Sequence, residues 1–290
     1  CKDCGYIFKQ ININDSKYVK QLNKSYYDNY NYLDLIKRSE RRLIFDKTRA
    51  HTYLKKIEKS IDLKNVRVLI DVGGAEGWFS QYIKLIYDNI EVFNIDPDRH
   101  IINVGKKLYP SVKHLKLKLE NIDKFKKKFD VMTFWGGIYR AAQLDQVVEK
   151  LWEKANSNAS LFITLPYSLD DSRLQDNSYR ESITEIFNNN GIISYLNEKY
   201  LINIFSKKFD FVKKVNFQNY PFKKNIPLFY FKKNNGKKIK SYRLKNQYKE
   251  NLKYLKNYSY LLSIKNIRNF IKKNKYNKIA VWVNKNPDII

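Results

Sequence analysis

The sequence predicts an α/β fold with a doubly wound, mostly parallel sheet, and three observations carry that prediction. Between residues 63 and 233, short apolar runs alternate with segments whose apolar residues recur at helical spacing. A loop with three glycines, between Asp71 and Gly77, joins the first apolar run to the first such helix. The apolar fraction of 43% over 290 residues is enough for a packed core.

The expected elements follow one another as a parallel sheet requires. Strands are expected at 66–72, 90–96, 112–119, 129–135 and 159–166. Helices are expected from Trp78 to Ile86, over 98–110, where Pro110 ends the helix, and from Leu144 to Leu151. A further helix and strand are expected over 196–217, with Asn197 as N-cap, and a last strand over 225–233. Alternation of this kind places helices on both faces of the sheet.

Regions of different composition flank this central domain, residues 63–233. Residues 1–12 contain a Cys-x-x-Cys turn, "CKDCGYIF", followed by a short strand. Residues 13–62 are expected to be helical. Residues 234–290 are basic and mainly helical, and their apolar residues at helical spacing predict a region that docks on the central domain.

Charge is the unusual feature of the composition. The formal net charge is +27, and residues 201–290 alone hold 23 Lys and Arg against 3 Asp and Glu. Such a region can attract nucleic acid, acidic glycans or phosphorylated substrates. The abundance of Lys, Asn, Ile and Tyr throughout the chain also fits a general drift of composition, which needs no polyanion.

Cysteine content and hydropathy exclude two classes of protein. Cys1 and Cys4 are the only cysteines, so there is no disulfide framework. No apolar run approaches the roughly 20 residues that span a bilayer, and no signal peptide is visible. The expectation is a soluble, cytoplasmic protein with no membrane span.

The glycine loop is suited to a ligand with an adenosine part. Glycines let the backbone turn tightly and approach a ligand, and the helix that follows directs its first N–H groups toward it. Asp96 ends the second strand, where a carboxylate can accept hydrogen bonds from ribose hydroxyls. Dinucleotide sites usually have a glycine where Ala75 stands, so the pattern Asp71-x-Gly-Gly-x-x-Gly favours another cofactor.

Several motifs in order resemble the class I S-adenosylmethionine-dependent methyltransferases, which have a Rossmann-like fold. The loop "DVGGAEG" resembles their first motif, and "FDVMTFWGGIYR" and "LFITLPYS" resemble their fourth and fifth strands. Within the class, the chain is most similar to methyltransferases associated with sugar and surface-glycan biosynthesis. "CKDCGYIF" looks like half of the zinc ribbon that precedes many of them. Because only one Cys-x-x-Cys pair is present, no metal site is expected in this chain.

The loop pattern and the resemblance together assign candidate site residues. Asp71, Gly73, Gly74 and Gly77 are expected on the methionine and ribose side of S-adenosylmethionine, and Asp96 at the ribose hydroxyls. Glu120 is a candidate near the adenine. By resemblance, Trp135 and Gly136 border the methionine end. Candidates for catalysis at the strand ends are Tyr139, Arg140 and Tyr167.

The function expected is methyl transfer to a small or nucleotide-linked acceptor, with a sugar of surface-glycan biosynthesis as one candidate. The family often has a histidine, which can act as a base, where this chain has Arg140. The three histidines, His51, His100 and His114, fall inside expected helices or strands and are interpreted as structural or solvated. Two alternatives stay open: a non-catalytic binding protein whose basic tail holds nucleic acid or glycan, and an RNA methyltransferase.

Overall fold

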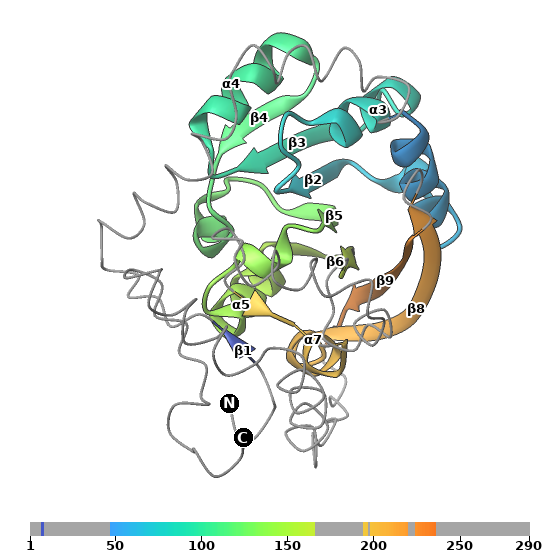
Figure 1. The fold of residues 1–290 in the computed structure, drawn as a ribbon, viewed down its shortest axis with the longest axis vertical. Coiled ribbons are helices and arrows are strands. Elements are labelled where there is room, and N and C mark those ends of the chain that lie inside the picture. The colour runs from blue at the N-terminus through green and yellow to red at the C-terminus, as the bar shows by residue number, and fades with distance from the viewer. Residues whose placement is uncertain (1–6, 9–46, 166–193, 197, 220–223, 236–290) are drawn as a thin grey trace, which may run out of the picture. The chain divides into compact units, whose positions relative to one another are not determined.

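The computed structural model describes residues 7–8, 47–165, 194–196, 198–219 and 224–235. The chain divides into two compact units. In one of them β1 (Ile7–Phe8) pairs antiparallel with β7 (Ser194–Tyr195). The other unit contains the sheet that positions the site, and Figure 1 shows its strands with their labels.

A seven-stranded sheet forms the centre of this second unit. Its strand order is β4-β3-β2-β5-β6-β9-β8, and the first five of these strands run parallel. Their bounds are β2 (Val68–Val72), β3 (Glu91–Asp96), β4 (Lys113–Lys116), β5 (Phe129–Trp135) and β6 (Ala155–Thr164). Then β9 (Lys224–Lys233) runs antiparallel to β6, and the edge strand β8 (Phe209–Asn219) antiparallel to β9.

The helices connect the parallel strands. They are α3 (Trp78–Ile86), α4 (Arg99–Leu108) and α5 (Leu144–Lys154), with short 3-10 turns η1 (Leu63–Asn65), η2 (Leu119–Lys124) and η3 (Ile138–Arg140). Helix α7 (Glu198–Phe205) precedes β8. Parallel crossovers are right-handed, so the reversal of strand order after β4 sends α5 to the face opposite α3 and α4.

A helix over residues 47–58 completes the core on one face of the sheet. Ala50, Tyr53, Leu54 and Ile57 are each at most 2% exposed and pack with α3 and with one side of the central strands. The described end of the expected helical region 13–62 therefore shares its core with the sheet.

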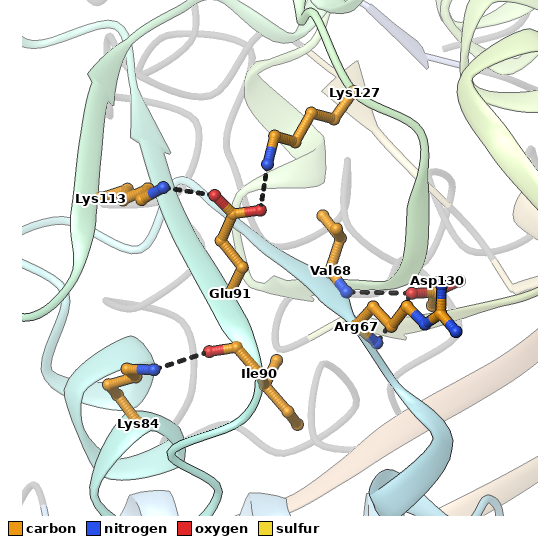
Figure 2. Close-up of polar contacts among 8 residues, drawn as sticks. All are labelled: Arg67, Val68, Lys84, Ile90, Glu91, Lys113, Lys127 and Asp130. Carbon is orange, nitrogen blue, oxygen red and sulfur yellow. Dashed lines mark hydrogen bonds and ion pairs between the residues drawn. The ribbon is translucent and has the colours of Figure 1, made fainter.

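Ion pairs and backbone contacts join the strands at their amino ends, as Figure 2 shows. Glu91, at the start of β3, accepts from both Lys113 of β4 and Lys127 in the loop before β5. One carboxylate oxygen of Asp130 accepts from the backbone amides of Arg67 and Val68, both at 2.9 Å. These contacts join β2, β3, β4 and β5 at the amino edge of the sheet.

The predicted doubly wound, mostly parallel sheet is confirmed, with differences at particular elements. The strand expected over 112–119 is limited to Lys113–Lys116, because the chain then turns into η2. The strand expected to begin at 159 starts at Ala155, directly after α5. Cys1, Cys4 and Asn197 lie outside the described residues, as does the basic region beyond residue 235.

Candidate functional site

The glycine loop lies where the strand order reverses. The chain passes from β2 to β3 on one side and returns to β5 on the other, and ligands of open α/β sheets bind at the carboxyl edge at such a point. Gly73 and Gly137 bring these loops close, since a Cβ added to Gly73 would lie 3.3 Å from the Gly137 Cα. Gly73 has a φ of +64° and is exposed, so its backbone is available to a ligand.

Helix α3 begins at this loop without a side-chain cap. Its N-cap is Gly77, with a φ of +89°, and no side chain accepts from its first amides. By contrast, Asp98 caps α4 by accepting from the amides of His100 and Ile101. Uncapped first-turn amides favour an electron-rich ligand group at the start of α3.

Asp71 lies fully buried near the end of β2. Its carboxylate accepts from the Thr133 hydroxyl at 2.8 Å and from the Ser80 hydroxyl at 3.2 Å. Burial raises the pKa of Asp71 to about 7, although these two hydrogen bonds favour the ionised form. Asp71 therefore fastens β2 to β5 and to α3 beneath the loop.

Asp96 ends β3 and is 4% exposed. Its Oδ1 accepts from the Asp98 amide at 2.9 Å. Burial raises the pKa of Asp96 to about 6, opposed by that hydrogen bond and by the positive charge of Arg140. A buried carboxylate with a raised pKa gains from further hydrogen-bond donors, and a pair of ribose hydroxyls would supply two.

Gly74 and Gly77 pack closely against side chains of the sheet. Both are buried, and a Cβ on Gly74 would come within 2.3 Å of Asn94 Oδ1 and 2.4 Å of Asp71 Oδ2. A Cβ on Gly77 would lie 2.8 Å from His114 Cε1. These glycines allow the loop to pack on side chains of β2, β3 and β4, while Gly73 and Ala75 retain exposed surface.

Aromatic side chains gather at the carboxyl end of β5. Trp135 stacks on Tyr53 of the 47–58 helix, with ring centroids 4.1 Å apart, and lies edge-on to Phe79 at 5.0 Å. The Arg49 guanidinium lies 4.8 Å from the centre of the Trp78 ring. The Trp135 Nε1 is buried and has no hydrogen-bond partner among the described residues.

The remaining candidates are spread around this edge of the sheet. The Glu120 carboxylate accepts from the Ala142 amide at 2.8 Å, so it joins η2 to the loop before α5. Gly136 has a φ of +89°, Tyr139 is 3% exposed and Arg140 is exposed. Tyr167 lies outside the described residues.

Three polar residues of the site were not identified from the sequence. Asn94 and Thr133 stand inside apolar strands beside Asp71, and Ser80 faces inward from the first turn of α3. A polar residue within an otherwise apolar strand is the signal that could have identified the first two. His114, interpreted as structural or solvated, is buried and hydrogen-bonded to Asn94 at 3.2 Å.

Residues 45–213 match the family model of the methyltransferase domain. The chain belongs to this methyltransferase family. The enzyme class expected from the sequence is thereby confirmed, and S-adenosylmethionine is the cofactor that agrees with it. No curated protein sequence matches the chain.

Solved structures share the methyltransferase fold at low sequence identity. The 1,6-didemethyltoxoflavin-N1-methyltransferase of Burkholderia thailandensis, bound to 1,6-didemethyltoxoflavin and S-adenosylhomocysteine, has a TM-score of 0.51 and 11% identity over 79% of this chain and 94% of its own. A Haloferax volcanii methyltransferase in complex with the activator Trm112 has a TM-score of 0.51 and 10% identity, covering 67% and 95%.

A Nostoc punctiforme protein described as an O-methyltransferase has a TM-score of 0.50 and 10% identity, covering 63% of this chain. This chain spans 55% of the length of the Nostoc protein. At these identities the comparisons establish the fold.

The donor set at this loop fits the cofactor. Exposed Gly73, the uncapped start of α3 and buried Asp96 together suit a nucleoside with a charged amino-acid part. Within the described residues, no three His, Cys, Asp or Glu side chains gather where they could hold a metal ion. In the same part of the chain, no helix is long and apolar enough to cross a bilayer.

Proposed function

We propose that this methyltransferase binds S-adenosylmethionine at the loop between β2 and α3 and transfers its methyl group to a small or nucleotide-linked acceptor. One observation carries the proposal. A buried acid with a pKa raised to about 6, Asp96, ends β3 beside a loop whose exposed Gly73 has a φ of +64°. The acid and the loop sit where the strand order reverses.

Each of these residues has a defined task in the proposal. Asp96 accepts hydrogen bonds from the ribose hydroxyls, and the backbone of Gly73 and the first amides of α3 face the methionine part. Asp71 supports the loop from below through Thr133 and Ser80. When bound, S-adenosylmethionine supplies an electrophilic methyl group on a sulfonium.

The acceptor lies beyond the methyl group, at the loop after β5. Arg140 is exposed there and always charged, which suits a phosphate or carboxylate of the acceptor better than proton removal. Tyr139 is 3% exposed, so it reaches an acceptor only if the loop moves. Orientation and exclusion of water carry most of the catalysis if the acceptor atom is already nucleophilic. A nucleotide-linked sugar is the first acceptor class to test.

Calorimetry on the purified protein tests the cofactor assignment. S-Adenosylmethionine should bind, Asp96→Ala should weaken binding sharply, and Gly73→Val should abolish it without unfolding the domain. The reason at Gly73 is local: a β-branched residue is strained at a φ of +64° and fills the ligand side of the loop. Binding of NAD in place of S-adenosylmethionine would refute the proposal.

The excess of positive charge in residues 201–290 favours RNA as a second candidate acceptor. RNA binding that weakens steeply with salt, together with methyl transfer to RNA, would support it. Methyl transfer to nucleotide sugars, with none to RNA, would support the small acceptor. The family match favours either enzyme over a binding protein without turnover.

A further inference from the structure

A row of polar residues crosses the apolar sheet just below the glycine loop. The strand register pairs His114 of β4 with Asn94 of β3, Asn94 with Asp71 of β2, and Asp71 with Thr133 of β5. Each of these four side chains is at most 4% exposed. Asp71 and Thr133 bond to each other, which leaves His114 and Asn94 as a separate pair.

This pair is connected to the loop by hydrogen bonds whose directions are fixed. The Asn94 amide donates to the Ala75 carbonyl at 2.7 Å. The same amide nitrogen lies 3.2 Å from His114 Nδ1, and His114 Nε2 lies 3.1 Å from the Tyr109 carbonyl. A carbonyl only accepts, so Nε2 carries the proton; Nδ1 is then free to accept the second Asn94 hydrogen.

The residue that receives this contact is a strained one. Ala75 has a φ of +51°, in the left-handed region where the Cβ of a non-glycine residue crowds the following carbonyl oxygen. It is partly exposed on the ligand side of the loop, and its backbone amide interacts with the Asp96 carboxylate. Its conformation therefore needs support from the buried side, and Asn94 supplies it.

We infer that His114 and Asn94 are positioning residues for cofactor binding: neutral His114 orients the Asn94 amide, and Asn94 holds Ala75 in its ligand-binding conformation. The inference rests on the proposed cofactor loop. It also explains why the neighbouring positions are glycines, because a Cβ at Gly105 would lie 2.5 Å from the His114 ring and one at Gly77 2.8 Å from it. The two glycines leave room for the imidazole between α4, the loop and β4.

Protonation of His114 would break this arrangement. With a proton on Nδ1, two donors would face each other, and the Asn94 amide could relieve the conflict only by giving up the Ala75 carbonyl. Burial lowers the pKa of His114, and the nearby positive charge of Lys106 on α4 lowers it further. Titratable side chains are also carried by Glu76 in the loop, by Asp71 on the neighbouring strand β2, and by Asp96, two residues after Asn94 on β3.

Two substitutions separate the two ring nitrogens. His114→Asn keeps an acceptor at the Nδ1 position, and His114→Gln keeps only a donor near the Nε2 position. The inference predicts S-adenosylmethionine affinity within about twofold of wild type for His114→Asn and about three- to tenfold weaker for His114→Gln, as expected for one lost hydrogen bond. As the pH is lowered, wild type should lose affinity more steeply than His114→Asn, which shares its carboxylates but lacks the imidazole.

Two readouts on the protein without cofactor keep this inference distinct from the proposed function. Nitrogen NMR should show His114 protonated at Nε2 and not at Nδ1. Hydrogen exchange at the Gly77 amide, which donates to the Gly74 carbonyl within the loop, should be faster in His114→Gln than in His114→Asn. If wild type binds no S-adenosylmethionine, the cofactor proposal fails while these readouts still decide the inference. Protonation at Nδ1, or equal exchange in the two variants, would overturn it.

Discussion

The raised pKa of Asp96 makes cofactor binding depend on pH in a way that can be calculated. The ribose hydroxyls donate to this carboxylate, so the ionised form is the one that binds. With a pKa of about 6, about 97% of Asp96 is ionised at pH 7.5 and about 9% at pH 5. The affinity for S-adenosylmethionine should therefore fall about tenfold over this interval through Asp96 alone.

Asp96→Asn isolates this share of the pH dependence. An asparagine keeps the shape and can still accept from the Asp98 amide, but it has no charge to lose. Hydrogen bonds to a charged group contribute about 1.5–3 kcal/mol, so the variant should bind about ten- to a hundredfold more weakly at pH 7.5. At pH 5 the ratio of the wild-type affinity to the variant affinity should be about tenfold smaller than at pH 7.5.

Calorimetric titrations at four pH values between 5 and 7.5 would measure both curves. Asp88→Asn, at an exposed position on the turn after α3, is the control for the change in net charge and should follow wild type. Because Asp71, with a pKa of about 7, also titrates in this range in both proteins, the informative quantity is the difference between the curves. Parallel curves for wild type and Asp96→Asn would refute the assignment of Asp96 to the ribose.

Three further predictions concern stability. The pKa of Asp71 is raised from 3.8 to about 7 in the folded state, so folding takes up a proton and the free energy of unfolding falls as the pH rises from 4 to 7. Asp71→Asn removes this effect. In urea titrations it should raise the free energy of unfolding by about 1–3 kcal/mol at pH 8 and change it little at pH 4. Gly74→Ala should cost about 1–3 kcal/mol, because its Cβ meets Asn94 and Asp71. Tyr53→Ala should cost about 3–5 kcal/mol through the lost stack, whereas exposed His51→Ala should cost under about 0.5 kcal/mol by thermal unfolding.

The alternation of elements and the chemistry of the loop could be predicted because they are local. A strand such as Val68–Val72 is visible as an apolar run, and α3 as a repeat at helical spacing. The glycines and the acid at the end of the second strand lie within 26 residues of one another, so their pattern survives in the sequence. These features led to the methyltransferase family, which the family match confirmed.

Contacts between distant residues decided the rest. In the sequence Gly74 and Gly77 cannot be distinguished from Gly73, but the structure turns the first two toward Asn94 and His114 and leaves the third exposed. The sequence separates Tyr53 from Trp135 by 82 positions, and only the packed helix over 47–58 brings their rings to 4.1 Å. His114 has no local pattern that links it to the loop, since its partner Asn94 reaches it through strand pairing. Periodicity reports which face of an element is buried, whereas register and packing determine which side chains meet there.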